Sequence, residues 1–113
     1  MTTSESVQQA AERLHAARPQ ATIILFGSRA RGDARSDSDV DFMVVLPQAP
    51  ASTRHEMVVL SDLLCPLRVW ADVLVVSAQR FREAAAVPGT LPHTVASEGK
   101  VLYGQHVTKR AAC

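Results

Sequence analysis

Two short apolar segments, separated by a polar stretch that ends in two acids, constrain the fold of this sequence most strongly. The first segment, residues 23–26, stops at Gly27, and a polar stretch rich in arginine follows it. The second segment, residues 42–46, comes directly after Asp39 and Asp41, which are one residue apart. Short apolar runs bounded by turn residues predict buried β-strands. Alternate residues of a strand face the same side, so the two acids should project together.

The two acids and the glycine together favour a metal and a phosphate. Parallel carboxylates repel each other unless a cation lies between them, and Mg²⁺ prefers such oxygen ligands. Gly27 predicts a tight turn at which the backbone can approach a phosphate closely. A third acid, Asp72, lies in the apolar run 70–76, where a carboxylate is costly unless it is paired or binds a metal. If that run pairs beside the first acids, three carboxylates converge, as two-metal phosphoryl transfer requires.

At this point the sequence resembles a known superfamily. Gly27-Ser28, then Asp39 and Asp41, then Asp72 on a later strand are similar to the signature of the polymerase-beta-type nucleotidyltransferases. This pattern sets residue types in separated segments, so it is more specific than any one of its motifs. We therefore take the resemblance as the leading hypothesis for fold and activity.

Within that superfamily, the sequence most resembles the minimal nucleotidyltransferase (MNT) domains. The similarity lies in the run Gly-Ser-Arg-Ala-Arg-Gly at 27–32, in Ser-Asp-Val-Asp-Phe at 38–42 and in the ending at 98–103. It covers about residues 20–104 of one domain, 1–113, with a short tail at 105–113. MNT domains are small prokaryotic proteins, often the antitoxin of a pair with a helical HEPN-domain toxin.

The resemblance implies a polymerase-beta-like fold and a set of site residues. Two Mg²⁺ ions would be held by three residues that are also the catalytic ones, Asp39, Asp41 and Asp72. ATP is the implied substrate, and its implied binding residues are Gly27, Ser28 and Arg29. The same stretch also holds Arg31 and Arg35, and the residues do not say which arginine contacts phosphate.

The acceptor implied by the resemblance is a hydroxyl group, with a tyrosine of a HEPN-type toxin as the expected one. Asp72 is the acid expected to orient or deprotonate that hydroxyl, because the other two acids hold the metal that carries the triphosphate. Two alternatives stay open. The chain could neutralise a partner by contact alone, or it could modify a small molecule, as antibiotic nucleotidyltransferases do.

Four other motifs share part of this pattern, and each fails at a required position. A P-loop needs Lys where the sequence has Asp33, and Arg29 interrupts a dinucleotide-binding fingerprint. An EF-hand loop needs Gly where Phe42 stands and Glu where Gln48 stands. Arg-Gly-Asp at 31–33 could suggest adhesion, but nothing else in the sequence reads as extracellular.

Composition excludes other classes of function. A net charge of +1 gives no electrostatic footprint for bulk nucleic-acid binding, and 4% aromatic residues leave few stacking platforms for single strands. With no signal peptide or membrane-spanning run, a cytoplasmic protein is expected. Cys65 and Cys113 are then expected to be reduced thiols.

The remaining pattern predicts alternating helices and strands. Strands are expected at 21–26, 40–46, 67–76 and 100–103. Helices are expected from a cap at Ser4 to residue 17, from Ser52 or Thr53 to 64, from a cap at Ser77 to 86, and over 91–97. This order predicts an α/β (α+β) fold with a small mixed β-sheet flanked by helices. The four histidines show no ligand spacing and are expected at the surface: His15, His55, His93 and His106.

Overall fold

The computed structural model describes residues 3–27, 40–67 and 71–104. Its elements are the helix α1 (Thr3–Ala17), the strands β1 (Thr22–Phe26) and β2 (Val40–Leu46), the helix α3 (Thr53–Leu64), a 3₁₀ turn (Cys65–Leu67), the strand β3 (Ala71–Ser77), the helices α4 (Ala78–Ala85) and α5 (Leu91–Glu98), and the strand β4 (Lys100–Tyr103).

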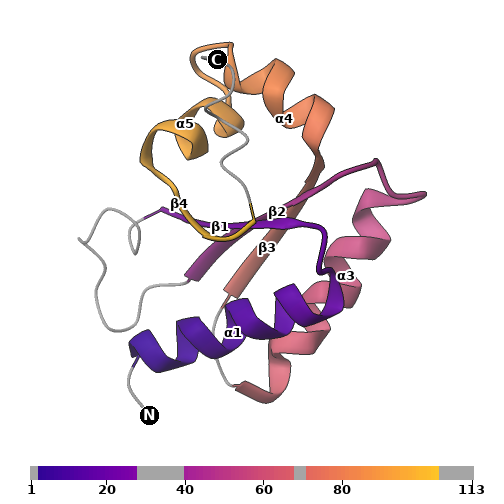
Figure 1. Cartoon of the computed structure of the whole chain (residues 1–113), viewed down its shortest axis with the longest axis vertical. Helices are drawn as coiled ribbons and strands as arrows, with labels where there is room; N and C mark the ends of the chain where they lie inside the picture. The colour runs from indigo at the N-terminus through magenta and orange to yellow at the C-terminus, as the bar shows by residue number, and fades with distance from the viewer. Residues whose placement is uncertain (1–2, 28–39, 68–70, 105–113) are drawn as a thin grey trace.

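The four strands form one mixed sheet in the order β3-β2-β1-β4. β1 is antiparallel to both β2 and β4, whereas β2 and β3 are parallel and joined through α3. Figure 1 shows the sheet between two helical layers, with α1 and α3 on one side and α4 and α5 on the other. The predicted fold class, a small mixed sheet flanked by helices, is therefore confirmed.

Both faces of the sheet are buried, which explains why the strands read as continuous apolar runs. On one face, alternate residues such as Ile23, Leu25 and Phe42 pack with Leu14 of α1 and Leu60 of α3. The intervening strand residues face the opposite layer. There they pack with one fully or almost fully buried residue from each of α4 and α5, Phe81 and Val95. The apolar residues of β1, β2 and β3 thus divide between two cores according to their parity in the strand.

Most predicted boundaries are confirmed to within one or two residues. Residues 40–46 form β2 as expected, and β1 is one residue shorter than expected. The hydroxyls of Ser52 and Ser77 accept from backbone N–H groups in the first turns of α3 and α4, as predicted for caps. Helix α1 already begins at Thr3, so Ser4 lies inside it and the predicted cap position was wrong.

The predicted start of the third strand at Leu67 was wrong. Leu67 ends a 3₁₀ turn, and β3 begins only at Ala71. Pro66 lies in that turn, where its fixed φ suits tight coiling and its missing N–H costs little. Apolar composition alone could not distinguish this turn from strand.

Two of the histidines are not surface residues, which corrects the expectation. The ring of His15 is half-buried and stacks on Tyr103 with their centroids 4.3 Å apart. The Nδ1 atom of half-buried His93 lies 2.9 Å from the Ala85 carbonyl oxygen and links α5 to α4. His55 is exposed as predicted, and His106 lies outside the described residues.

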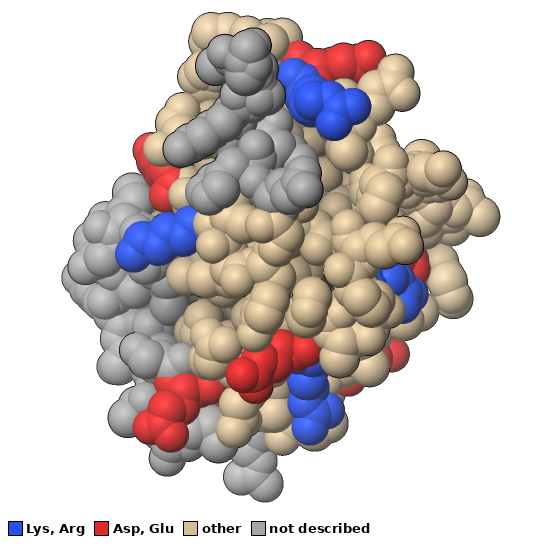
Figure 2. Space-filling model, in the orientation of Figure 1, with Lys and Arg blue, Asp and Glu red and all other residues tan. Residues whose placement is uncertain are grey.

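The face shown in Figure 2 carries acidic and basic side chains around its margin and uncharged residues across its middle. Neither sign gathers into a large patch there, which agrees with the small net charge of the sequence. Across the described ranges, no helix has the length and apolar character needed to cross a membrane.

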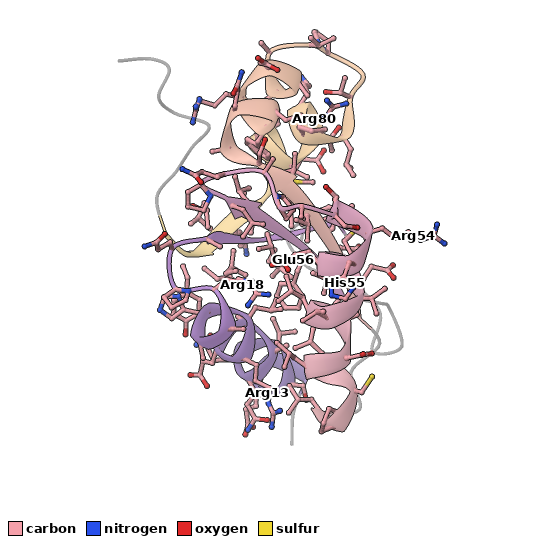
Figure 3. All side chains as sticks on the ribbon, turned by 90° about the vertical axis from the view of Figure 1, so that its right-hand side faces the viewer. Arg13, Arg18, Arg54, His55, Glu56 and Arg80 are labelled. Carbon is pink, nitrogen blue, oxygen red and sulfur yellow. The ribbon has the colours of Figure 1, made fainter. Side chains whose placement is uncertain are left out.

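One ion pair joins the two helices on the α1/α3 side of the sheet. Arg18, just after α1, donates from Nε and Nη2 to the carboxylate of Glu56 in the first turn of α3, the second bond measuring 3.0 Å. Figure 3 shows the two side chains pointing toward each other between these helices. The Arg18 side chain is 35% exposed and that of Glu56 13%. The hydrogen bond from Arg18 is the main reason that the pKa of Glu56 lies below its ordinary value.

Glu56→Gln should lower the free energy of unfolding by about 1 kcal/mol at neutral pH, a small value because solvent screens the partly exposed pair. Because the pKa of Glu56 is lower in the folded state, the ion pair makes its full contribution to the free energy of unfolding at pH values above the unfolded pKa of about 4.3. It is lost as the pH falls through the folded pKa. Urea denaturation should therefore show the gap between wild type and variant closing in acid. Glu12→Gln, an exposed acid of α1, should change stability by less than about 0.5 kcal/mol at any pH.

Candidate functional site

The turn at Gly27 is the first feature of the candidate site. Gly27 follows the last residue of β1 and has a φ of +79°, in the left-handed region that L side chains rarely adopt. A Cβ atom at this position would overlap Oδ2 of Asp41 and lie 3.3 Å from its Cγ. Both the backbone and the neighbouring carboxylate therefore require glycine here. The predicted tight turn is confirmed.

Two of the three predicted acids lie on adjacent strands at the same level. Asp41 of β2 and Asp72 of β3 are register partners in the parallel pair. Adjacent strands are about 4.8 Å apart, so the two Cα atoms are near neighbours. Residues two apart in a strand face the same side, so Asp41 lies on the face of Met43 and Asp72 on the face of Leu74. This is the same face of the sheet for both acids, the one that α4 and α5 cover.

The two acids lie at one end of the sheet, where β1 ends and β2 and β3 begin. Phe26, the residue before Gly27, is the register partner of Asp41 in the antiparallel pair. Three strands thus bring Gly27, Asp41 and Asp72 together from distant parts of the chain. The predicted pairing of the Asp72 strand beside the Asp41 strand is confirmed.

The burial of Asp72 differs from the expectation. Asp72 is exposed, because it is the second residue of a strand at the edge of the sheet, whereas Asp41 in the inner strand β2 is half-buried. The argument that Asp72 needs a metal to offset its burial was therefore wrong. Its place in the candidate site rests instead on its register with Asp41, and its exposure leaves it accessible to a ligand.

The other predicted site residues lie outside the described ranges. They are Ser28, Arg29 and Asp39, together with the further arginines Arg31 and Arg35. Among the residues that the structure describes, no group of three His, Cys, Asp or Glu side chains could hold a metal ion. A three-carboxylate site that includes Asp39 therefore stays a prediction.

The described part of the site fits a hard cation and a phosphate group. Carboxylate oxygens of the kind that Asp41 and Asp72 provide are the ligands that Mg²⁺ prefers. Beside them, Gly27 leaves backbone without a side chain, so a phosphate oxygen could come close to it. These residue types are the ones that a metal-bound phosphate would need at this end of the sheet.

Gly99 supports this end of the sheet and was not among the site residues predicted from the sequence. A Cβ atom there would lie 2.6 Å from the carbonyl oxygen of Val95 and 2.7 Å from Cγ2 of Ile24. Gly99 therefore lets α5 and the start of β4 pack tightly against β1, close to where β1 turns at Gly27. Only its place in the Glu-Gly-Lys ending at 98–100 could have signalled this role.

Two surface hollows lie at the other end of the sheet, with volumes of about 480 and 370 Å³. Both are lined by residues 19–21 and Pro47, and neither is lined by the two described acids. Neither of these two hollows marks the candidate site, which is identified by the chemistry of its described residues.

Comparisons with known proteins agree with the fold. A family model described as a nucleotidyltransferase domain matches residues 7–102. A search of curated proteins found no match. One similar solved structure, a candidate nucleotidyltransferase from Sulfolobus solfataricus, has a TM-score of 0.62 and 20% identity. That match covers 89% of this chain and 79% of the other.

A second similar structure is described as a toxin-antitoxin with AMP-PNP. It has a TM-score of 0.58 and 21% identity, and the match covers 86% of this chain and 73% of that one. At these identities, the two structures show a shared fold.

Proposed function

The chain belongs to the nucleotidyltransferase domain family, and from this premise we propose that it transfers a nucleoside monophosphate from a triphosphate to a hydroxyl acceptor. The observation that carries the proposal is the meeting of Gly27, Asp41 and Asp72 at one end of the sheet. ATP is the proposed substrate, and the loss of pyrophosphate accompanies the transfer.

The acids at the site fit the metal that such a transfer needs. Asp41 and Asp72 would hold Mg²⁺, with Asp39 as the third proposed ligand. The proposed number of Mg²⁺ ions is two. Bound there, Mg²⁺ would neutralise charge on the triphosphate and on the leaving pyrophosphate. Gly27 and Ser28 are the proposed contacts for the phosphates, and Arg29 adds a positive charge near them.

The proposed role of Asp72 is to orient the acceptor hydroxyl and accept its proton. Asp72 is exposed and lies near the start of the edge strand β3, so an acceptor can reach its carboxylate from solvent. Asp41 is half-buried against the Gly27 turn, which places it closer to the proposed phosphate position. The two acids thus have different environments, and different roles follow from them. Positioning and charge neutralisation would supply most of the rate enhancement.

The proposed acceptor is a tyrosine of a toxin partner, with a HEPN-domain toxin as the expected type. The structural likeness to one protein described as a toxin-antitoxin supports a toxin partner. Its description with AMP-PNP supports an adenine nucleotide. Attachment of AMP would then silence the toxin, and the chain would act as an antitoxin.

The proposed transfer predicts a nucleotide adduct on the copurifying partner. After incubation with Mg²⁺ and ATP, mass spectrometry should find the adduct on one partner residue with the wild-type chain. Asp41→Asn should abolish it, whereas Asp62→Asn, an exposed acid on α3, should leave it unchanged. A tight complex that carries no nucleotide adduct, even with the wild-type chain, would contradict the transfer.

Neutralisation by contact alone is the second candidate, because the toxin-antitoxin likeness would serve it equally well. The two functions differ in what Asp72→Ala does to a toxin-dependent growth defect. Neutralisation by contact should survive the substitution, and neutralisation by transfer should not. The antibiotic-type transferase remains a third reading, for which a nucleotide adduct would appear on a small molecule.

A further inference from the structure

The two edges of the sheet are built differently. β4 has four residues, starts with the exposed Lys100 and pairs with β1 through a register shift between Ile23 and Ile24. Short length, lysine and irregular pairing are features that protect sheet edges from other strands. β3 has seven residues without Lys, Arg or Pro and pairs with β2 in unbroken register. The β3 edge therefore has less of this protection than the β4 edge, with the exposed Asp72 as its one charged residue.

No other described segment pairs with the outer side of β3. Within residues 3–27, 40–67 and 71–104, the backbone hydrogen bonds outside regular elements involve none of residues 71–77. The side-chain hydrogen bonds reach this strand only at the Ser77 hydroxyl, which caps α4. In the described part of the chain, the outer N–H and C=O groups of β3 are thus available to another strand.

Apolar side chains on β3 are also incompletely covered. Leu74 and Val76 are half-buried on the face toward α4 and α5. Their register partners in β2, Met43 and Val45, are only 3% and 2% exposed. The uncovered apolar surface on this face therefore increases toward the edge, beside the unpaired backbone.

We propose that β3 pairs antiparallel with β3 of a second copy of the chain, about a two-fold axis at Leu74. In this register, all seven residues of each strand are paired, Ala71 opposite Ser77 and Asp72 opposite Val76. Directly opposed residues face the same side of a sheet, so the two Leu74 side chains cover one another, and Val76 of each copy lies opposite Asp72 of the other. The result joins the two sheets into one continuous sheet with an isologous interface.

The charges of the strand suit this self-pairing. Asp72 is the one charged residue of β3, and the register puts it beside the second copy's Ser77, where α4 of that copy begins. A helix N-terminus carries partial positive charge, and Arg80, labelled in Figure 3, lies exposed in that first turn. The two Asp72 residues are four positions apart along the seam, about 14 Å. Antiparallel pairing thus opposes no like charges.

Light scattering during size-exclusion chromatography, with a reductant present, tests the proposal on the full chain. The wild type should run as a dimer that dissociates on dilution. Leu74→Lys puts two ammonium groups opposite each other at the axis, and the dimer should be lost. Val87→Lys changes a valine that is 52% exposed beyond the end of α4 and should leave the dimer intact. A wild type that stays monomeric at every soluble concentration overturns the proposal.

A charge-swap experiment separates lost pairing from lost folding. Leu74→Lys and Leu74→Glu should each be monomeric, and an equimolar mixture should restore a dimer containing one copy of each. A wild-type dimer that persists with Leu74→Lys would place the interface elsewhere. A monomeric wild type that binds another protein in a Leu74-dependent way would assign the edge to that protein instead. Either result overturns the second copy as occupant.

Discussion

Asp72→Asn should lower the rate of nucleotidyl transfer by about 10²–10⁴-fold, the usual contribution of a positioned acid or base. The amide has the shape of the carboxylate, but it cannot accept the acceptor's proton and is a weaker ligand for a cation. Because Asp72 is exposed near the start of β3, the substitution should leave the fold intact. The measurement is the initial rate of pyrophosphate release at saturating ATP, with thermal melting to verify folding.

Asp62→Asn is the matched control for this prediction. Asp62 is also an exposed aspartate, but it lies on α3, on the other side of the sheet from the candidate site. Its substitution should leave both the rate and the melting temperature nearly unchanged. If Asp72→Asn and Asp62→Asn transfer nucleotide at the same rate, Asp72 has no part in the chemistry.

Gly27→Ala should remove most of the activity and also lower stability. The positive φ costs an L residue about 1–2 kcal/mol. The added methyl group would also occupy the place of the Asp41 carboxylate, so that side chain must move. A displacement of about 1 Å in a catalytic group can cost 10²-fold in rate, and we expect a loss of about that size. Initial rates and urea denaturation measure the two effects.

Gly89→Ala separates the two costs of the Gly27 substitution. Gly89 also has a positive φ, +93°, but apart from its two chain neighbours no described residue has an atom within 4 Å of the position that its Cβ would take. Gly89→Ala should therefore lose a similar 1–2 kcal/mol from its backbone while transferring nucleotide at the wild-type rate. Equal rates for both alanine variants would show that the Gly27 turn does not position Asp41 for transfer.

Local patterns in the sequence were enough to predict β2 and the Gly27 turn. The expectation of β2 follows from the apolar run 42–46, which Asp41 precedes inside the strand and Pro47 closes. The turn follows from glycine at the end of an apolar strand, which few other residues could replace. In both cases the signal lies within a few neighbouring residues, so it could be found without knowing the fold.

The expectations that failed depended on neighbours from elsewhere in the fold. His15 looks like a surface residue of α1 until Tyr103 of β4 stacks against its ring. Asp72 looks buried in an apolar run until the strand order places β3 at an edge. The start of β3 was misplaced because an apolar 3₁₀ turn and an apolar strand have the same composition.

The sequence by itself determined which residue types could form the site: a glycine at the end of one strand, the pair Asp39 and Asp41 at the start of a second, and Asp72 in a third. Only the tertiary structure decided that Asp41 and Asp72 are register partners, and that β3 is an outer strand among the four described strands of the sheet. The physical reason is that the alternation of side chains is a local property of each strand, whereas register and strand order arise from pairing between distant segments. That pairing is selected by the packing of both faces of the sheet, which no single segment encodes.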